Sequence, residues 1–103
     1  MIARFWSARA THDRAPTYVE HLRSHVLPTV RSIDGYGGAV LLEREEADQV
    51  EILVVTFWRS LEAIRGFAGA DLEEAVVAEE AAALLTQWDH RVRHYEVVVE
   101  DHV

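Results

Sequence analysis

The chain has 103 residues, half of them hydrophobic, which suits one small domain with an apolar core. It has no cysteine, so disulfide frameworks, thiolate zinc sites and a cysteine nucleophile are excluded. The formal net charge of −8 argues against a nucleic-acid ligand, because phosphate binding needs clustered cations. No apolar run approaches the ~18 residues of a membrane span, and no apolar leader is visible, so we expect a cytoplasmic protein without membrane association.

The first two elements are expected to be a strand and a helix. Alternation predicts a strand over Ile2–Arg9, with Ile2, Arg4, Trp6 and Ala8 on one face. A helix is expected over residues 15–32, because Pro16 suits a first helical turn and apolar residues recur at helical spacing. Pro28 lies inside this helix and should kink or break it near Val26.

Two strands are expected next, over Tyr36–Glu45 and Gln49–Trp58, with an acidic hairpin tip between them. The glycine pair Gly37-Gly38 should let the first of them bend. Ile52–Val55 is apolar on both faces, and a strand buried on both faces needs a layer on each side. One helix layer covers a single face, so the pattern predicts a homodimer in which a second copy covers the other.

The last third of the chain is expected to hold short helices and a final strand. Ser60 is a good N-cap for a helix that ends at Gly69. Further helical pieces are expected from Asp71 to about Ala78 and from Glu79 to Gln87, and a strand over Arg91–Glu100. The order β-α-β-β-α-β predicts an α+β, ferredoxin-like fold, an antiparallel sheet with helices on one face.

Five motifs together resemble the antibiotic biosynthesis monooxygenase family. They are Met1-Ile2-Ala3-Arg4-x-Trp6, Gly35-x-Gly37-Gly38, Trp58-Arg59-Ser60, Phe67-Ala68-Gly69-x-Asp71 and His94-Tyr95-Glu96-Val97. The resemblance covers residues 1–103 as a single domain and implies a dimeric α+β barrel with a pocket between the sheet and helices of each subunit. It also implies a cofactor-independent, monooxygenase-like oxidoreductase acting on a small planar or polyketide-like molecule. An isomerase or cyclase on the same scaffold, or a non-catalytic binding or interaction module, is the alternative.

Haem-degrading members of that family use an Asn on the first strand, a Trp in the second helix and a His one turn further on. This chain has no Asn, Phe67 stands where the Trp would be, and Val77 stands where the haem ligand is expected. Haem degradation by that route is therefore not implied, and no cofactor is expected. Haem binding without degradation, through His21, His25 or His94, is a further alternative that a Soret band on adding hemin would reveal.

Tyr18, His21 and His25 lie one helical turn apart, so they share a face of the first helix. They could serve as base and hydrogen-bond donor in a pocket. Two imidazoles at this spacing can also bind a divalent metal, but no third ligand lies nearby in the sequence, and no metal site is expected. The alternative is that Tyr18 packs on the sheet and the histidines border solvent.

Arg4 lies on a strand face that is otherwise apolar, where a cation needs an anion to offset its desolvation. If the strands follow the usual 4-1-3-2 order, His94 and Glu96 come close to it. A substrate carboxylate or enolate is one candidate anion, and an Arg4–Glu96 ion pair is the alternative. His94 is the first acid–base candidate because its ordinary pKa lies near neutral pH.

Several aromatic side chains could form a slot for a planar ligand, namely Trp6, Tyr36, Trp58, Phe67 and Trp88. Plain core packing is the alternative, since each aromatic side chain buries about 150–250 Å². The expected chemistry is proton removal by His94 with Tyr18 or His21, while Arg4 stabilises the resulting anion. Trp6 and Phe67 would keep water out.

Overall fold

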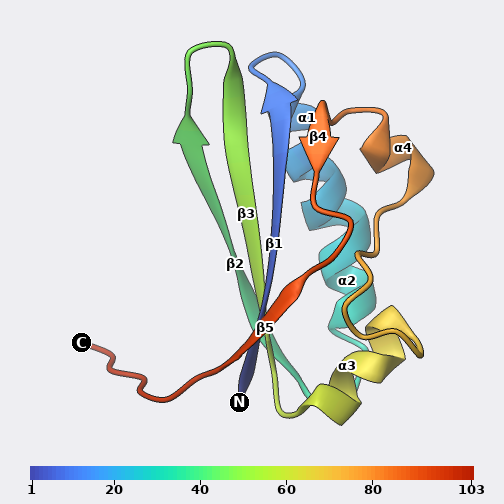
Figure 1. The fold of residues 1–103 in the computed structure, drawn as a ribbon, viewed down its shortest axis with the longest axis vertical. Coiled ribbons are helices and arrows are strands. Elements are labelled where there is room, and N and C mark those ends of the chain that lie inside the picture. The colour runs from blue at the N-terminus through green and yellow to red at the C-terminus, as the bar shows by residue number, and fades with distance from the viewer.

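A computed structural model describes residues 1–103 as an antiparallel sheet with all helices on one face (Figure 1). The strands are β1 (Ile2–Thr11), β2 (Tyr36–Glu45), β3 (Gln49–Trp58), β4 (Gln87–Trp88) and β5 (Arg93–Glu96). The helices are α1 (Ala15–His21), the π-helical turn η1 (Leu22–Val26), α2 (Leu27–Val30), α3 (Leu61–Ala68) and α4 (Glu79–Ala82). The predicted ferredoxin-like α+β fold is confirmed. None of these helices combines the length and the apolar character that crossing a membrane requires.

The strand order is β2-β3-β1-β4, and β5 also pairs with β1. The fourth position of the expected order is thus shared by two short strands at one edge of β1. The register places Arg4 opposite Thr56 on β3 and opposite His94 on β5. The predicted bend in β2 is present as a bulge, where the pairing shifts between Tyr36 and Gly38 and Gly38 has a φ of 126°.

The first helix begins as predicted, with Pro16 in its first turn. Pro28 has no N–H, and the α-helical bonding gives way to a π-helical turn, η1, just before it. The N–H of Leu27 donates to the carbonyl of Leu22, five residues back. The predicted interruption near Val26 is therefore a widened turn, and the helix continues through α2.

The helix predicted from Asp71 to about Ala78 is wrong. This segment is irregular, and Glu74 bridges to Arg91 in an isolated antiparallel pair. The helix predicted over Glu79–Gln87 shrinks to the single turn of α4, and Gln87 already belongs to β4. Backbone partners on β1 explain the difference, because the N–H groups of Thr86 and Asp89 donate to carbonyls of that strand.

The last strand is shorter than predicted, because β5 ends at Glu96. The N–H of Val97 still donates to the carbonyl of Met1, but Val98 and Val99 are exposed. The chain then leaves the sheet as a tail that extends away from the body of the molecule (Figure 1). Three consecutive valines favour a strand by propensity, but β1 has no residue left to pair with them.

The core consists of two clusters on the helical side of the sheet. The larger cluster joins β1 and β3 to α1, and includes Tyr18 and Ile52. The smaller consists of Val30, Trp58 and Ile64, and brings α3 under the end of β3. Helix α3 is fixed at both ends as predicted, since Ser60 Oγ accepts from the N–H of Ala63 and Gly69 ends it with a φ of 79°.

Candidate functional site

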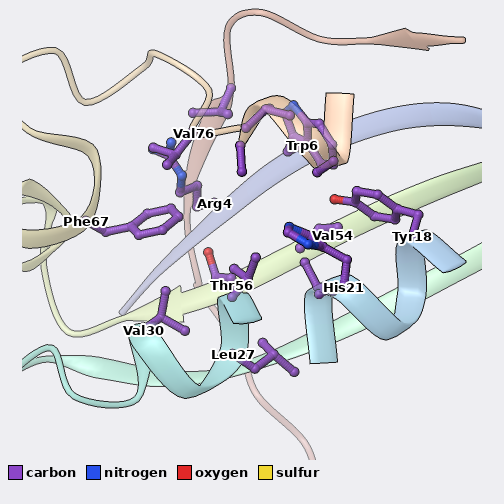
Figure 2. A pocket seen from close by; sticks show the side chains of 16 residues that line it. Arg4, Trp6, Tyr18, His21, Leu27, Val30, Val54, Thr56, Phe67 and Val76 are labelled. Atoms are coloured by element: carbon purple, nitrogen blue, oxygen red, sulfur yellow. The ribbon is translucent and has the colours of Figure 1, made fainter. Parts of the chain in front are cut away.

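A cavity of about 60 Å³ lies where the two core clusters meet, between the sheet and the helices (Figure 2). Its floor is formed by Arg4 and Trp6 of β1 and Val54 and Thr56 of β3. One wall comes from the first helix, with Tyr18, His21, Leu22, Val26, Leu27 and Val30. The other side is closed by Phe67, Val76, Val77, Ala78, Ala81 and Val92. We call residues 69–78, which cross this side without regular structure, the roof segment.

Arg4 is the one cation in the wall, and only 4% of its surface is exposed. Its Nη1 donates to the carbonyl of Leu72, and its Nη2 donates to the carbonyl of Glu74 at 2.9 Å. The guanidinium carbon lies 5.6 Å from the ring centre of Phe67. Burial lowers the pKa of Arg4 to about 10, so it remains a cation at neutral pH.

The Arg4–Glu96 ion pair considered from the sequence is not formed. The β1–β5 register places Glu96 opposite Ile2, near the end of the sheet and exposed to solvent. The guanidinium turns instead toward the roof segment, where it meets backbone carbonyls that carry no net charge. Arg4 is therefore a buried cation without a carboxylate partner, and an arginine has more N–H groups than these contacts use.

His94 lies beside Arg4, as the predicted strand order required, but it is not part of the cavity wall. Its Nε2 is 3.1 Å from Nη1 of Arg4, and it must accept this hydrogen bond because a guanidinium can only donate. The proton of the neutral ring then sits on Nδ1. Burial and, secondarily, the charge of Arg4 lower the pKa of His94. Its ring borders a shallow surface depression with Glu73 and Tyr95.

Tyr18 lies at the end of the cavity away from Arg4, and its hydroxyl points into the space (Figure 2). Burial raises the pKa of Tyr18 well above its ordinary value, so the side chain stays a neutral phenol. The ring of Trp6 lies 6.1 Å away between centres, and its Nε1 donates to the carbonyl of Asp89 at 2.8 Å. The ring centre of His21 lies 6.3 Å from that of Tyr18, and His21 is half-buried in the wall.

The other candidate residues lie outside the cavity. His25 is exposed on the far side of His21, with ring centres 5.3 Å apart. Trp58 is fully buried in the smaller core cluster, and its Nε1 donates to Thr56 Oγ1 at 2.8 Å. Tyr36 packs edge-on against Trp58, and it does not reach the cavity either.

Sequence reasoning missed two kinds of wall residue. Thr56 could have been found, because it faces Arg4 across the β1–β3 ladder that the alternating pattern predicts. Val76 carried no such signal, since it belongs to a segment that was expected to be helical, and Val77 was considered only as the residue at the expected haem-ligand position.

The donor set does not fit a haem held by a protein ligand from the roof. Val77, at the expected ligand position, lines the cavity with an apolar side chain that cannot ligate iron. No group of three or more His, Cys, Asp or Glu side chains is arranged to hold a metal ion. His21 is the one imidazole in the wall.

Residues 1–79 match the family model described as antibiotic biosynthesis monooxygenase. Among curated proteins, none is significantly similar in sequence. Among solved structures, a variant of MhuD with two manganese protoporphyrin IX molecules per active site has a TM-score of 0.71 and 21% identity, over 100% of both chains. MhuD of Mycobacterium tuberculosis, described as a haem degrader with two haems in its active site, has a TM-score of 0.64 and 21% identity, over 99% of this chain and 100% of that one.

A third structure is a monooxygenase from the gene ActVA-Orf6 of Streptomyces coelicolor in complex with nanaomycin D. It has a TM-score of 0.63 and 16% identity, over 99% of this chain and 89% of that one. At these identities the likeness to solved structures establishes a shared fold. The family match covers more than three quarters of the sequence, from β1 to the first residue of α4. The chain therefore belongs to the antibiotic biosynthesis monooxygenase family.

Proposed function

We propose that the chain is a monooxygenase-like oxidoreductase that acts, without a resident cofactor, on a small planar or polyketide-like carbon acid. The observation that carries this proposal is Arg4, a buried cation that has no carboxylate partner in a mostly apolar wall. A buried charge without an opposite charge is costly, and the anion of a carbon acid would offset that cost. Family membership and the nanaomycin complex of a protein with the same fold support the substrate class.

In the proposed reaction, His21 accepts the proton, because it is the one imidazole in the cavity wall. Tyr18 does not act as the base, since burial keeps its phenol protonated. Arg4 stabilises the enolate or phenolate that forms. His94 holds the guanidinium in place from behind, so it is a positioning residue. Trp6 and Phe67 exclude water from the reacting carbon.

The oxidation of a CH₂ group to a carbonyl is balanced with molecular oxygen alone. The deprotonated carbon passes one electron to O₂, and the two radicals combine to form a carbon–oxygen bond in a peroxide. Loss of water from the peroxide leaves the carbonyl. One oxygen atom enters the product, the other leaves as water, and the substrate supplies all four electrons. A substrate that cannot pass an electron to O₂ would instead be reprotonated at another atom, which is isomerisation.

A ligand of this kind requires the cavity to open. Its present volume, about 60 Å³, is well below the ~150 Å³ of an apolar cavity that holds benzene. We propose that the roof segment moves aside, because it has no helix or strand of its own and begins at Gly69, whose φ is 79°. An anion at Arg4 would compete with the carbonyls of Leu72 and Glu74 for the guanidinium, so binding and opening would favour each other.

The test is oxygen uptake with anthrone, a carbon acid with one reactive CH₂ group. We expect one O₂ consumed per carbonyl formed, and a loss of about 10²-fold in kcat/KM for Arg4→Gln. Arg14→Gln is the matched control, because it removes an exposed arginine that lies outside the cavity. Equal activities of Arg4→Gln and the wild type would contradict the role of Arg4.

A second candidate function is a non-catalytic module that binds an organic acid. The position of His94 favours it, because Nε2 is occupied by Arg4 and a single imidazole remains at the wall. In this case anthrone or its oxidised product would bind, and the binding would depend on Arg4, but no O₂ would be consumed. Calorimetry beside the uptake assay separates the two functions.

We also propose that residues 1–103 act as one domain and form a homodimer through the face of the sheet opposite the helices. This open face presents mostly apolar side chains, namely Phe5, Val40, Leu42, Leu53, Val55, Phe57 and Tyr95. Leu42 is 49% exposed there, and no element of the same chain covers it (Figure 1). A second copy with the same face would remove this surface from water.

Sedimentation equilibrium tests the dimer. Leu42→Asp should weaken self-association at least about tenfold, because it buries a charge in the proposed interface. Leu61→Asp is the matched control, since Leu61 is 45% exposed but lies on α3, away from the open face. A monomeric wild type at high micromolar concentration would contradict the proposal, as would equal effects of the two substitutions.

A further inference from the structure

The cavity has a polar group at each end, and the proposed reaction uses only one of them directly. In Figure 2, Arg4 lies beside Phe67 at one end, and the Tyr18 hydroxyl enters the space at the other, with the Val54 side chain between them. We propose that Tyr18 determines specificity by donating a hydrogen bond to a carbonyl oxygen of the ligand. The cavity would then select organic acids that carry a second, acceptor oxygen at the far end. This inference rests on the proposed function, which places the acid at Arg4.

The Tyr18 hydroxyl has no partner in the chain. The side chain is only 4% exposed, and its hydroxyl makes no hydrogen bond to another residue. Trp6 cannot serve as its acceptor, because the indole nitrogen is a donor and already binds the carbonyl of Asp89. The hydroxyl oxygen is not sealed by protein atoms, because Thr11 Oγ1 is the one buried side-chain polar atom without a partner, and the Tyr18 hydroxyl instead faces the cavity. A ligand atom in the cavity can therefore reach it.

The chemistry of both ends requires acceptors on the ligand. Tyr18 keeps its proton because burial raises its pKa, so it is available as a donor at neutral pH. Arg4 is a donor at every N–H. A ligand that satisfies both must carry an anionic oxygen at one end and a carbonyl or similar oxygen at the other. Between them it must be apolar, because Trp6 and Val54 line the middle of the cavity.

Backbone spacing along β1 and the packing of Tyr18 on Trp6 set the scale of the distance between the two ends. Arg4 and Trp6 are separated by two residues on one face of β1, which is about 6.6 Å along a strand. The ring of Tyr18 packs against Trp6, with 6.1 Å between centres. A benzene ring with substituents at opposite positions has a comparable span. Keto-acids built on one aromatic ring are therefore the ligand class that this arrangement favours.

Calorimetry with two probes of the same shape tests the inference. 4-Acetylbenzoate has a carboxylate and a ketone oxygen at opposite ends, and 4-isopropylbenzoate replaces the ketone with a methyl-bearing carbon. In Tyr18→Phe, the affinity for 4-acetylbenzoate relative to 4-isopropylbenzoate should fall about 3- to 10-fold from its wild-type value, the effect of one neutral hydrogen bond. Tyr36→Phe makes the same chemical change outside the cavity and should leave the ratio unchanged.

The outcomes separate this inference from the proposed function. An unchanged ratio in Tyr18→Phe, with both acids still bound through Arg4, would overturn the role of Tyr18 and leave the acid site standing. Failure of the wild type to bind either acid, or binding that Arg4→Gln does not weaken, would overturn the acid site and this inference with it.

Discussion

Residues 2–68 and residues 69–103 enclose the same cavity but are held together in different ways. The first region contains three ten-residue strands in a continuous ladder and a helix capped at both ends. The second contains two short strands and a single helical turn. Its two strands pair with β1, and Ala81 and Leu85 join the larger core cluster. The roof segment, however, is attached to the first region through individual polar contacts, those of Arg4 with Leu72 and Glu74.

This difference indicates where the molecule can move. The ladder and its apolar core open only by exposing many groups at once, whereas a segment tied by a few hydrogen bonds can open locally. Ligand entry is therefore expected through the roof segment. The residue that ties the roof segment, Arg4, is also the residue proposed to meet the ligand.

The largest expected effect comes from the core of the first region. Trp58→Ala removes a fully buried ring and should lower the free energy of unfolding by about 3–5 kcal/mol, measured by urea denaturation. Trp88→Ala is the comparison in the second region, because this ring is only partly buried on β4. Trp88→Ala should lower the free energy of unfolding by clearly less than Trp58→Ala. Equal losses would show that both regions belong to one cooperative core, and would break the distinction.

A smaller, local effect is expected where the side chain of Arg4 holds the roof segment. Arg4→Met leaves the carbonyls of Leu72 and Glu74 without their donor, which should lower the local protection of residues 69–78 by about 1–3 kcal/mol. The global stability should change less, since an apolar side chain replaces a buried charge. Hydrogen exchange read residue by residue measures both quantities.

Arg4→Lys sharpens this test. It keeps the positive charge but cannot reach two carbonyls with a planar fork, so protection of the roof segment should be intermediate. If Arg4→Met instead lowers protection equally in the β1–β3 ladder and in residues 69–78, Arg4 stabilises the whole fold. The roof segment then does not open independently of the sheet.

The first region was largely predictable from the sequence, because its signals are local and agree with its packing. Strand alternation located β1, and a run apolar on both faces located β3. Ser60 and Gly69 marked the ends of α3, and Gly37-Gly38 marked the bulge. In the second region the local signal was misleading. Residues 79–87 are rich in Ala and Glu and have high helix propensity, but hydrogen bonds to β1 decided the structure of the end of this segment.

The wall of the cavity was predictable in part. Alternation and helical spacing found Arg4, Trp6, Tyr18, His21 and Phe67, all of which line the cavity. Aromatic character alone could not separate wall from core, so Tyr36 and Trp58 were included although they lie outside it. Strand order placed His94 next to Arg4, but only the register and the turn of the guanidinium show that it stands behind the cation.

The smallest expected effect is a dependence of the roof segment on pH through His94. Burial and the charge of Arg4 lower the pKa of His94, so the native state binds fewer protons than the unfolded chain. The contribution of neutral His94 to the stability of the native state is then complete above the ordinary histidine pKa of about 6.5. It is lost as the pH falls below that value through the lowered pKa. Protonation removes the acceptor that Nε2 offers to Arg4 and places two cations side by side.

Exchange protection of residues 69–78, corrected for the intrinsic pH dependence of exchange, should therefore decrease on acidification from about pH 6.5, while the β1–β3 ladder should not respond. His94→Gln keeps an acceptor without a titrating ring, so the decrease should disappear. If the decrease in protection persists in His94→Gln, the titration of another group must cause it. The Asp71 carboxyl is then the first to examine, but Arg91 lowers its pKa below the ordinary aspartate range, so its contribution would be lost only in more acidic solution. The pH at which exchange protection falls thus shows whether the roof segment is held by the contact of His94 with Arg4 or by the ion pair of Asp71 with Arg91.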